Sequence, residues 1–88
     1  LGFQDIPWPL LYTPTGSESI TPQSVGAFLL SPLHSQGKSR EERLSDAMLR
    51  WEPNGFEGRW ISRIKERERP KIKEAVAAVY GSLVRLMN

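Results

Sequence analysis

Residues 72–87 read IKEAVAAVYGSLVRLM and carry the clearest helical pattern in the chain. Apolar side chains recur along this segment at the spacing that places them on one face of an α-helix. The members of this apolar face are Ile72, Val76, Val79, Tyr80, Leu83 and Met87. We therefore expect a long amphipathic helix here, with one face against a core.

Two shorter helices are predicted before this segment from their end signals. Thr21 followed by Pro22 is typical of a helix start, with threonine as the N-cap and proline at the first helical position, and Pro32 ends the segment. Ser39 with Glu42 three residues later is a capping-box pattern, which predicts the start of a second helix.

The second predicted helix ends before Pro53, because proline cannot continue a helix. Its apolar face is expected to hold Leu44, Ala47, Met48 and Trp51. Beyond Phe56, a further helical turn or two is predicted from Trp60, Ile61 and Ile64. No segment alternates in the way a strand does, so the predicted class is all-α.

The first 20 residues are expected to form an extended arm rather than a long helix. Residues 5–9 read DIPWP, and each proline forces extended backbone on the residue before it. We expect the ring of Trp8 to pack onto the helical body, because the two flanking prolines stiffen the arm and reduce the entropy lost when it docks. The predicted organisation is thus an arm over residues 1–20 and a helical domain over residues 21–88.

Composition excludes several classes of protein. The 88 residues suffice for one small core. The absence of cysteine excludes a disulfide scaffold, a thiolate zinc site and a cysteine nucleophile. It also favours an intracellular setting, because small secreted domains usually depend on disulfides. The single histidine, His34, has no second ligand type beside it, and the glycines do not cluster as a phosphate-binding loop requires. No apolar run approaches the ~20 residues that span a bilayer. We therefore expect no enzyme activity, metal, cofactor or membrane insertion, and the start at Leu1 suggests part of a longer protein.

Positive charge is confined to the second part of the chain. Residues 38–88 hold all 12 Lys and Arg residues and 8 of the 10 acids. The densest stretch runs from residue 59 to residue 73, and the candidate partner-binding bases in it are Arg59, Arg63, Arg67 and Lys71. Two interpretations remain open: a phosphate-contacting patch for RNA or DNA, or a solvated helix surface, which either has no partner or recognises an acidic protein surface. The interspersed acids favour the second, with RNA contact as a secondary activity.

Three aromatic residues surround a proline in the middle of the chain. Trp51 and Phe56 bracket Glu52, Pro53 and Asn54, and Trp60 follows, so this stretch is expected to be a loop whose two ends are anchored in one core. The segment LRWEPNGF, residues 49–56, resembles the end of helix II and the His-Pro-Asp loop of a J-domain.

A narrower resemblance covers nearly the whole chain. The chain is similar to the C-terminal J-like region of the NF-kappa-B-inhibitor-like family, in which an Asp-Leu-Pro-Trp-Pro segment precedes a short helix, a charged helix ending in Arg-Trp-His-Pro-Asp, and a last helix of Val-x-x-Val-x-x-x-Leu type. The matching parts here are residues 5–9, residues 50–56, and Val76, Val79 and Leu83. The resemblance implies a small J-domain-like helical hairpin.

The loop residues depart from the J-domain pattern at the two charged positions. The resemblance implies that the His-Pro-Asp loop docks an Hsp70 ATPase domain, yet Glu52 stands in place of the histidine and Asn54 in place of the aspartate, while Pro53 is kept. Asn54 cannot offer the anion that would pair with an arginine of Hsp70. We therefore expect a degenerate J-loop that does not stimulate Hsp70.

The resemblance further implies a nuclear protein tied to pre-mRNA splicing. On this basis we expect a protein-protein interaction module that binds one or more protein partners within a ribonucleoprotein or spliceosomal assembly. Besides the four bases named above, Trp8 is a candidate contact residue if its ring is exposed rather than packed. A J-domain cochaperone that activates Hsp70 and a basic RNA-binding module are the two alternatives.

Overall fold

The computed structural model describes residues 2–31 and 37–88, and all the regular structure in these two ranges is helical. The α-helices are α1 (Pro22–Leu29), α2 (Arg40–Trp51), α3 (Pro53–Trp60) and α4 (Arg69–Met87). Two short 3-10 helices, η1 (Phe3–Asp5) and η2 (Ser17–Ser19), precede α1, and two more, η3 (Ile61–Arg63) and η4 (Glu66–Glu68), lie between α3 and α4. The predicted all-α class is confirmed.

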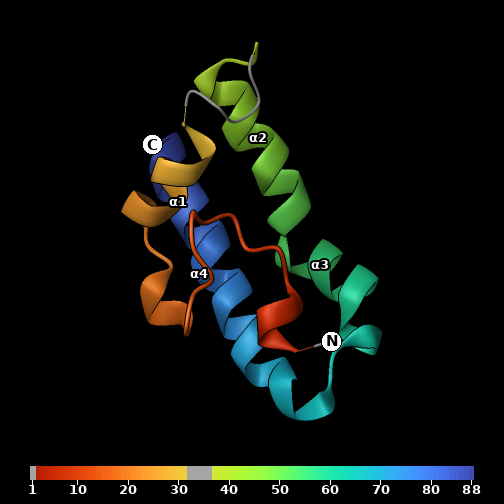
Figure 1. The fold of residues 1–88 in the computed structure, drawn as a ribbon. Coiled ribbons are helices and arrows are strands. Elements are labelled where there is room, and N and C mark those ends of the chain that lie inside the picture. The colour runs from red at the N-terminus through yellow and green to blue at the C-terminus, as the bar shows by residue number, and fades with distance from the viewer. Residues whose placement is uncertain (1, 32–36) are drawn as a thin grey trace.

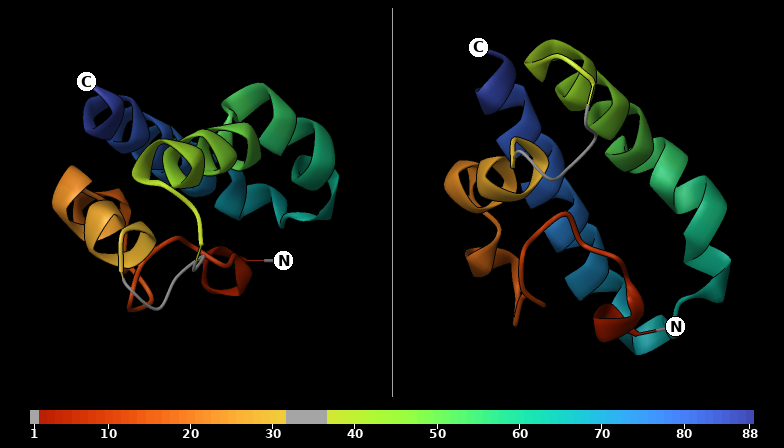
Figure 2. Two further views of the ribbon diagram at one scale, coloured as in Figure 1. Left: turned by 90° about the horizontal axis from the view of Figure 1, so that it is seen from above. Right: turned by 45° about the horizontal axis from the view of Figure 1, so that its top comes forward.

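Helix α4 is the centre of the arrangement, because α1, α2 and α3 all contact it. Helices α2 and α3 follow one another along one side of the molecule, and α4 returns antiparallel to them (Figures 1 and 2). The start of α2 consequently lies beside the end of α4, where Arg40 Nη2 donates a hydrogen bond to the carbonyl oxygen of Leu86 at 2.6 Å. The N-terminal arm crosses the face of this hairpin (Figure 1).

The predicted helix starts are confirmed by their hydrogen bonds. Thr21 Oγ1 accepts a bond from the amide of Ser24 at 3.1 Å, and Pro22 occupies the first position of α1. At α2 the capping box is reciprocal: Ser39 Oγ accepts from the amide of Glu42, and the Glu42 carboxylate accepts from the amide of Ser39, both at 3.2 Å. Each box satisfies amides that the first turn of a helix leaves without a partner.

The prediction of a loop across residues 51–56 is wrong. Helix α2 ends at Trp51, a single residue follows, and α3 already begins at Pro53. Proline stops the preceding helix but fits the first turn of a new one, because the amide it lacks has no helical partner there. The chain therefore reverses at residues 61–68, through η3 and η4, and not at the Trp-x-Pro segment.

The core is built around the apolar face of α4. Four of its six predicted members are fully buried: Ile72, Val76, Val79 and Leu83. Tyr80 is half-buried and Met87, at the end of the helix, is exposed. Val25 of α1, Leu44 of α2 and Phe56 of α3 are buried in the same cluster, so all four α-helices share one core.

The N-terminal arm belongs to this core as well. Its buried apolar residues are Phe3, Ile6, Trp8, Leu10 and Ile20. Two polar contacts also hold the arm to the start of α4: the amide of Phe3 donates to Glu68 Oε1 at 3.1 Å, and Ser17 Oγ donates to Glu74 Oε1 at 2.7 Å. The arm is therefore packed on the helices through residues spread from Phe3 to Ile20, although Leu11 and Tyr12 are exposed, and the expected docking of Trp8 is confirmed.

Five rings form a continuous aromatic series that links the arm to α2 and α3. The rings of Trp8 and Trp51 stack with centroids 5.4 Å apart and planes 19° from parallel, and those of Trp51 and Phe56 stack at 5.6 Å and 16°. Phe3 extends the series at one end, 4.9 Å from Trp8, and Trp60 at the other, 6.4 Å from Phe56. Trp8 Nε1 donates to the carbonyl oxygen of Phe3 at 2.9 Å, so its one polar atom is satisfied while its ring is 7% exposed.

Replacing Trp8 by alanine should lower the free energy of unfolding by about 3 kcal/mol, because the change removes a buried ring that contacts two others. Urea unfolding followed by circular dichroism measures it. Tyr12→Ala is the matched control, since this aromatic residue of the same arm is 56% exposed and its loss should change the stability by less than about 0.5 kcal/mol. Equal unfolding midpoints for the two variants would contradict the packing of the arm.

Candidate functional site

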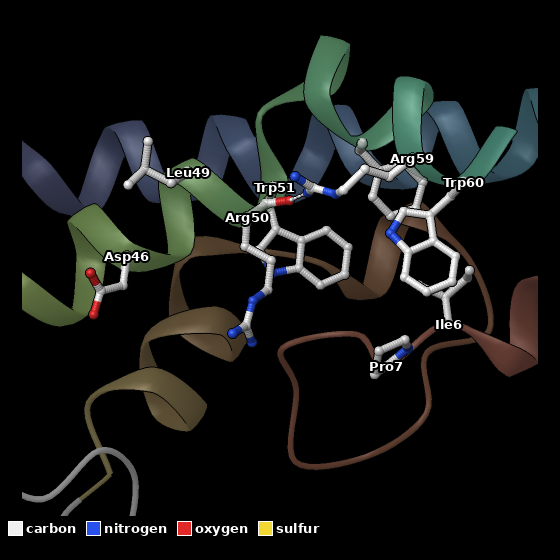
Figure 3. A pocket seen from close by; sticks show the side chains of 9 residues that line it. Ile6, Pro7, Asp46, Leu49, Arg50, Trp51, Arg59 and Trp60 are labelled. Atoms are coloured by element: carbon white, nitrogen blue, oxygen red, sulfur yellow. Dashed lines mark hydrogen bonds between the residues drawn. The ribbon is translucent and has the colours of Figure 1, made fainter.

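A groove of about 550 Å³ opens where the arm meets α2 and α3 (Figure 3). Its lining comes from the arm, the last turns of α2, and α3: Ile6, Pro7, Asp46, Leu49, Arg50, Trp51, Phe56, Arg59 and Trp60. The aromatic series supplies three of these residues, so the packing that holds the arm in place also shapes the groove.

The floor of the groove is apolar and rigid. Ile6, Trp51 and Phe56 are buried, and Trp60 is half-buried beside them. Figure 3 shows Ile6 and Pro7 of the arm on the side of the groove where Trp60 lies. A concave apolar surface with aromatic rings is the usual lining of a ligand or peptide site.

Two arginines lie on the rim. Arg59 Nη2 donates to the main-chain carbonyl of Arg50 at 2.6 Å, drawn as the dashed line in Figure 3. This carbonyl lies in the last turn of α2, whose carbonyl groups lack helical partners, so Arg59 satisfies one of them and ties α3 to the end of α2. The side chain of Arg50 is itself exposed.

Leu49 is the most exposed large apolar residue of the described part of the chain, at 76%. It stands five residues after the buried Leu44, which places it about 140° away around α2 and off the face that packs on the core. A single exposed leucine is unremarkable, but this one borders an apolar groove. The combination extends the apolar surface beyond the floor.

Glu52, Pro53 and Asn54, the expected degenerate J-loop, form a tight joint between two helices. The carboxylate of Glu52 accepts hydrogen bonds from the amides of Asn54 and Gly55, at 3.3 and 2.8 Å. Glu52 is therefore the N-cap of α3, and its negative charge is favourable at this end of the helix. The joint lies between the groove residues Trp51 and Phe56 and sets the angle at which α3 leaves α2.

The candidate bases are divided among different roles. Arg59 lines the groove, and the guanidinium of Arg63 lies over the ring of Trp60, 5.7 Å from its centroid. Lys71 Nζ lies 4.4 Å from the ring centroid of Phe3, at the other end of the aromatic series. Arg67 is exposed in η4. The structure thus brings Arg59 and Arg63 to the groove region, while Lys71 covers a ring of the arm.

Trp8 is not an exposed contact residue, and this part of the prediction is corrected. The ring lies in the core between Phe3 and Trp51, so it supports the groove from beneath rather than facing a partner. Its burial follows from the docking of the arm.

Within residues 2–31 and 37–88, no group of three or more His, Asp or Glu side chains is placed to hold a metal ion. His34 lies outside the described residues. Of the helices described, none combines the length and the apolar character needed to cross a bilayer.

No protein-family model matches the chain, and neither the curated proteins nor the solved structures include one that matches it.

Several groove residues were missed from the sequence, chiefly Leu49, Arg50 and the arm residues Ile6 and Pro7. One signal was present for Leu49, since its position is out of phase with the apolar face of α2. The contribution of Ile6 and Pro7 depends on the docking of the arm, and no local pattern encodes it.

Removing the cap of α3 should destabilise the fold. We expect Glu52→Ala to lower the free energy of unfolding by about 1 kcal/mol, because two amides of the first turn lose their acceptor. Glu52→Gln should cost less, since the amide oxygen keeps one acceptor in place. Chemical denaturation measures the free energy of unfolding of both variants. The control is Glu66→Ala, which changes an exposed glutamate of η4. A loss in Glu66→Ala as large as that in Glu52→Ala would show that the cap has no specific effect.

Proposed function

We propose that this chain is a non-catalytic protein-protein interaction module that binds a partner through the groove between the arm, α2 and α3. The observation that carries the proposal is the exposed Leu49 beside a groove whose floor is made of buried aromatic and aliphatic side chains. Exposed apolar surface of this kind, with arginine and aromatic residues around it, is typical of the central part of a protein interface.

The groove is poorly equipped for acid-base chemistry. Its nine lining residues include one carboxylate, Asp46, and Lys38 Nζ already pairs with it. General acid-base catalysis needs positioned titratable groups that can reach a substrate. The arginines of the rim bind anions well but transfer protons poorly. These properties favour recognition over reaction.

The cellular setting of the proposal rests on resemblance. The segments at residues 5–9 and 50–56 resemble the J-like region of the NF-kappa-B-inhibitor-like family. We accordingly place the partner in the nucleus, within a ribonucleoprotein or spliceosomal assembly. The same segments build the groove, because Ile6 and Pro7 come from the first and Arg50, Trp51 and Phe56 from the second.

Pull-down from nuclear extract with two leucine variants tests the proposal. Leu49→Glu places a charge beside the groove, and Leu11→Glu places one on a similarly exposed leucine of the arm, 68% against 76%, which is outside the groove lining. We expect Leu49→Glu to lose at least one partner that the unmodified chain and Leu11→Glu retain. Nuclease treatment of the extract should leave this complex intact.

Two outcomes contradict the proposal. If both variants retain every partner, the groove is not the binding site. If nuclease abolishes all association and the complexes re-form on added RNA, the basic RNA-binding alternative replaces the interaction module.

The cochaperone alternative has a separate test. We expect no stimulation of Hsp70 in a steady-state ATPase assay, because the Glu52 carboxylate is bound to the amides of its own helix and Asn54 carries no charge. The double change Glu52→His with Asn54→Asp is the informative comparison, since it restores both polar residues of the motif. Severalfold stimulation by the unmodified chain, lost in Pro53→Ala, would establish the cochaperone instead.

A further inference from the structure

We propose that the partner segment bound in the groove is a short acidic peptide, with bulky apolar side chains for the floor and carboxylates for the arginines of the rim. This inference rests on the proposed function, because it names the occupant of the same groove. It follows from the charge of the rim, the chemistry of the floor and the size of the groove.

The rim carries net positive charge that the protein itself does not neutralise. Arg50 and Arg59 both line the groove, against the single acid Asp46, which is already paired with Lys38. The acid within α3, Glu57, lies 3.8 Å from Lys73 Nζ, and the carboxylate of Glu52 at the N-cap of α3 accepts the amides of Asn54 and Gly55. An incoming carboxylate therefore meets two arginines and a single acid, Asp46, whose charge is offset by Lys38.

The arginines keep donors available for a ligand. Arg59 uses one terminal nitrogen for its bond to the Arg50 carbonyl, and a guanidinium has five N–H donors. Arg50 takes part in that bond through its main chain, so its side chain is not held by it. Arginine pairs with carboxylates through two parallel hydrogen bonds, which adds geometric selectivity to the charge attraction.

A third cation lies beside the groove wall. The guanidinium of Arg63 lies over the ring of Trp60, which itself lines the groove. Together with Arg50 and Arg59 it adds to the positive potential at the groove. Such a potential acts on an approaching charge over about one Debye length, about 8 Å at physiological salt. Such a field accelerates the approach of an acidic segment and rejects a basic one.

The size of the groove suits a short peptide segment. A volume of about 550 Å³ is in the range of small-ligand sites and can enclose a few bulky side chains, but not the surface of a folded domain. A few apolar anchors in a rigid pocket, surrounded by polar contacts, are the usual arrangement in peptide recognition.

The binding experiment uses three synthetic 12-residue peptides against the ¹⁵N-labelled chain. The first combines Glu with Leu and Phe, the second replaces every Glu by Lys, and the third keeps Glu but replaces Leu and Phe by Ser. The readout is the side-chain indole N–H signal of Trp60, which lines the groove, compared with that of Trp8, which is buried and bonded to Phe3. The first peptide should shift the Trp60 signal and leave that of Trp8 nearly unchanged.

Affinity and salt dependence then test the charge component. We expect the Lys peptide and the Ser peptide to bind at least about tenfold more weakly than the acidic apolar peptide, and added salt to weaken the latter. Arg50→Glu should weaken it by about tenfold, while Arg67→Glu, which alters an exposed arginine outside the groove lining, should change the affinity less than about twofold. Both positions are exposed, so neither variant should disturb folding.

Failure of this inference is distinguishable from failure of the proposed function. Equal binding of the Glu and Lys peptides would overturn the acidic-peptide inference, and so would equal effects of Arg50→Glu and Arg67→Glu. In either case, a complex in extract that depends on Leu49 would still support the interaction module. Absence of any shift of the Trp60 signal with the acidic peptide at millimolar concentration would overturn it as well. If the peptide binds but Leu49→Glu retains every partner in extract, the proposed function fails and the peptide site has no role in those complexes.

Discussion

The stacking of Trp8 on Trp51 is the contact on which the rest of the structure depends. It joins two segments more than 40 residues apart and aligns the other rings of the aromatic series on either side. The arm can make this contact at a low entropic cost, because proline on both sides of Trp8 already restricts its backbone. It also holds the arm where the neighbouring Ile6 and Pro7 line the groove beside Trp60. Stability and binding surface therefore share a single origin in this small protein.

Sequence patterns were sufficient for the helices whose ends have local signals. The caps at Thr21 and Ser39 and the apolar face of residues 72–87 are properties of neighbouring residues, and the structure reproduces them. The joint at Glu52 was not predictable in the same way. Pro53 is compatible with a loop and with the first turn of a helix, and the choice depends on whether an acceptor is present for the next amides. Here the side chain of Glu52 provides that acceptor.

The candidate site could be predicted only in part. The number of Lys and Arg residues identified the stretch around Arg59 but did not show what each cation contacts. These contacts depend on the rings that the fold brings close, since Arg63 lies over Trp60 and Lys71 over Phe3. Acids in the same stretch are also committed to structure, since Glu68 binds the arm and Glu57 pairs with Lys73. Local net charge therefore says little about which surface attracts a partner. The groove itself arises from contacts between distant segments, and its chemistry becomes visible only when these are assembled.

The bond between the amide of Phe3 and the carboxylate of Glu68 spans 65 positions of the chain and has a consequence for biosynthesis. Small helical proteins usually fold rapidly because most of their contacts are local. Here Phe3 is synthesised well before its partner Glu68 at the start of α4. At a synthesis rate of about 5–20 residues per second, Phe3 waits roughly 3 to 13 seconds for Glu68, and Trp8 waits roughly 2 to 9 seconds for Trp51. During these intervals the two rings lack the contacts that later bury them.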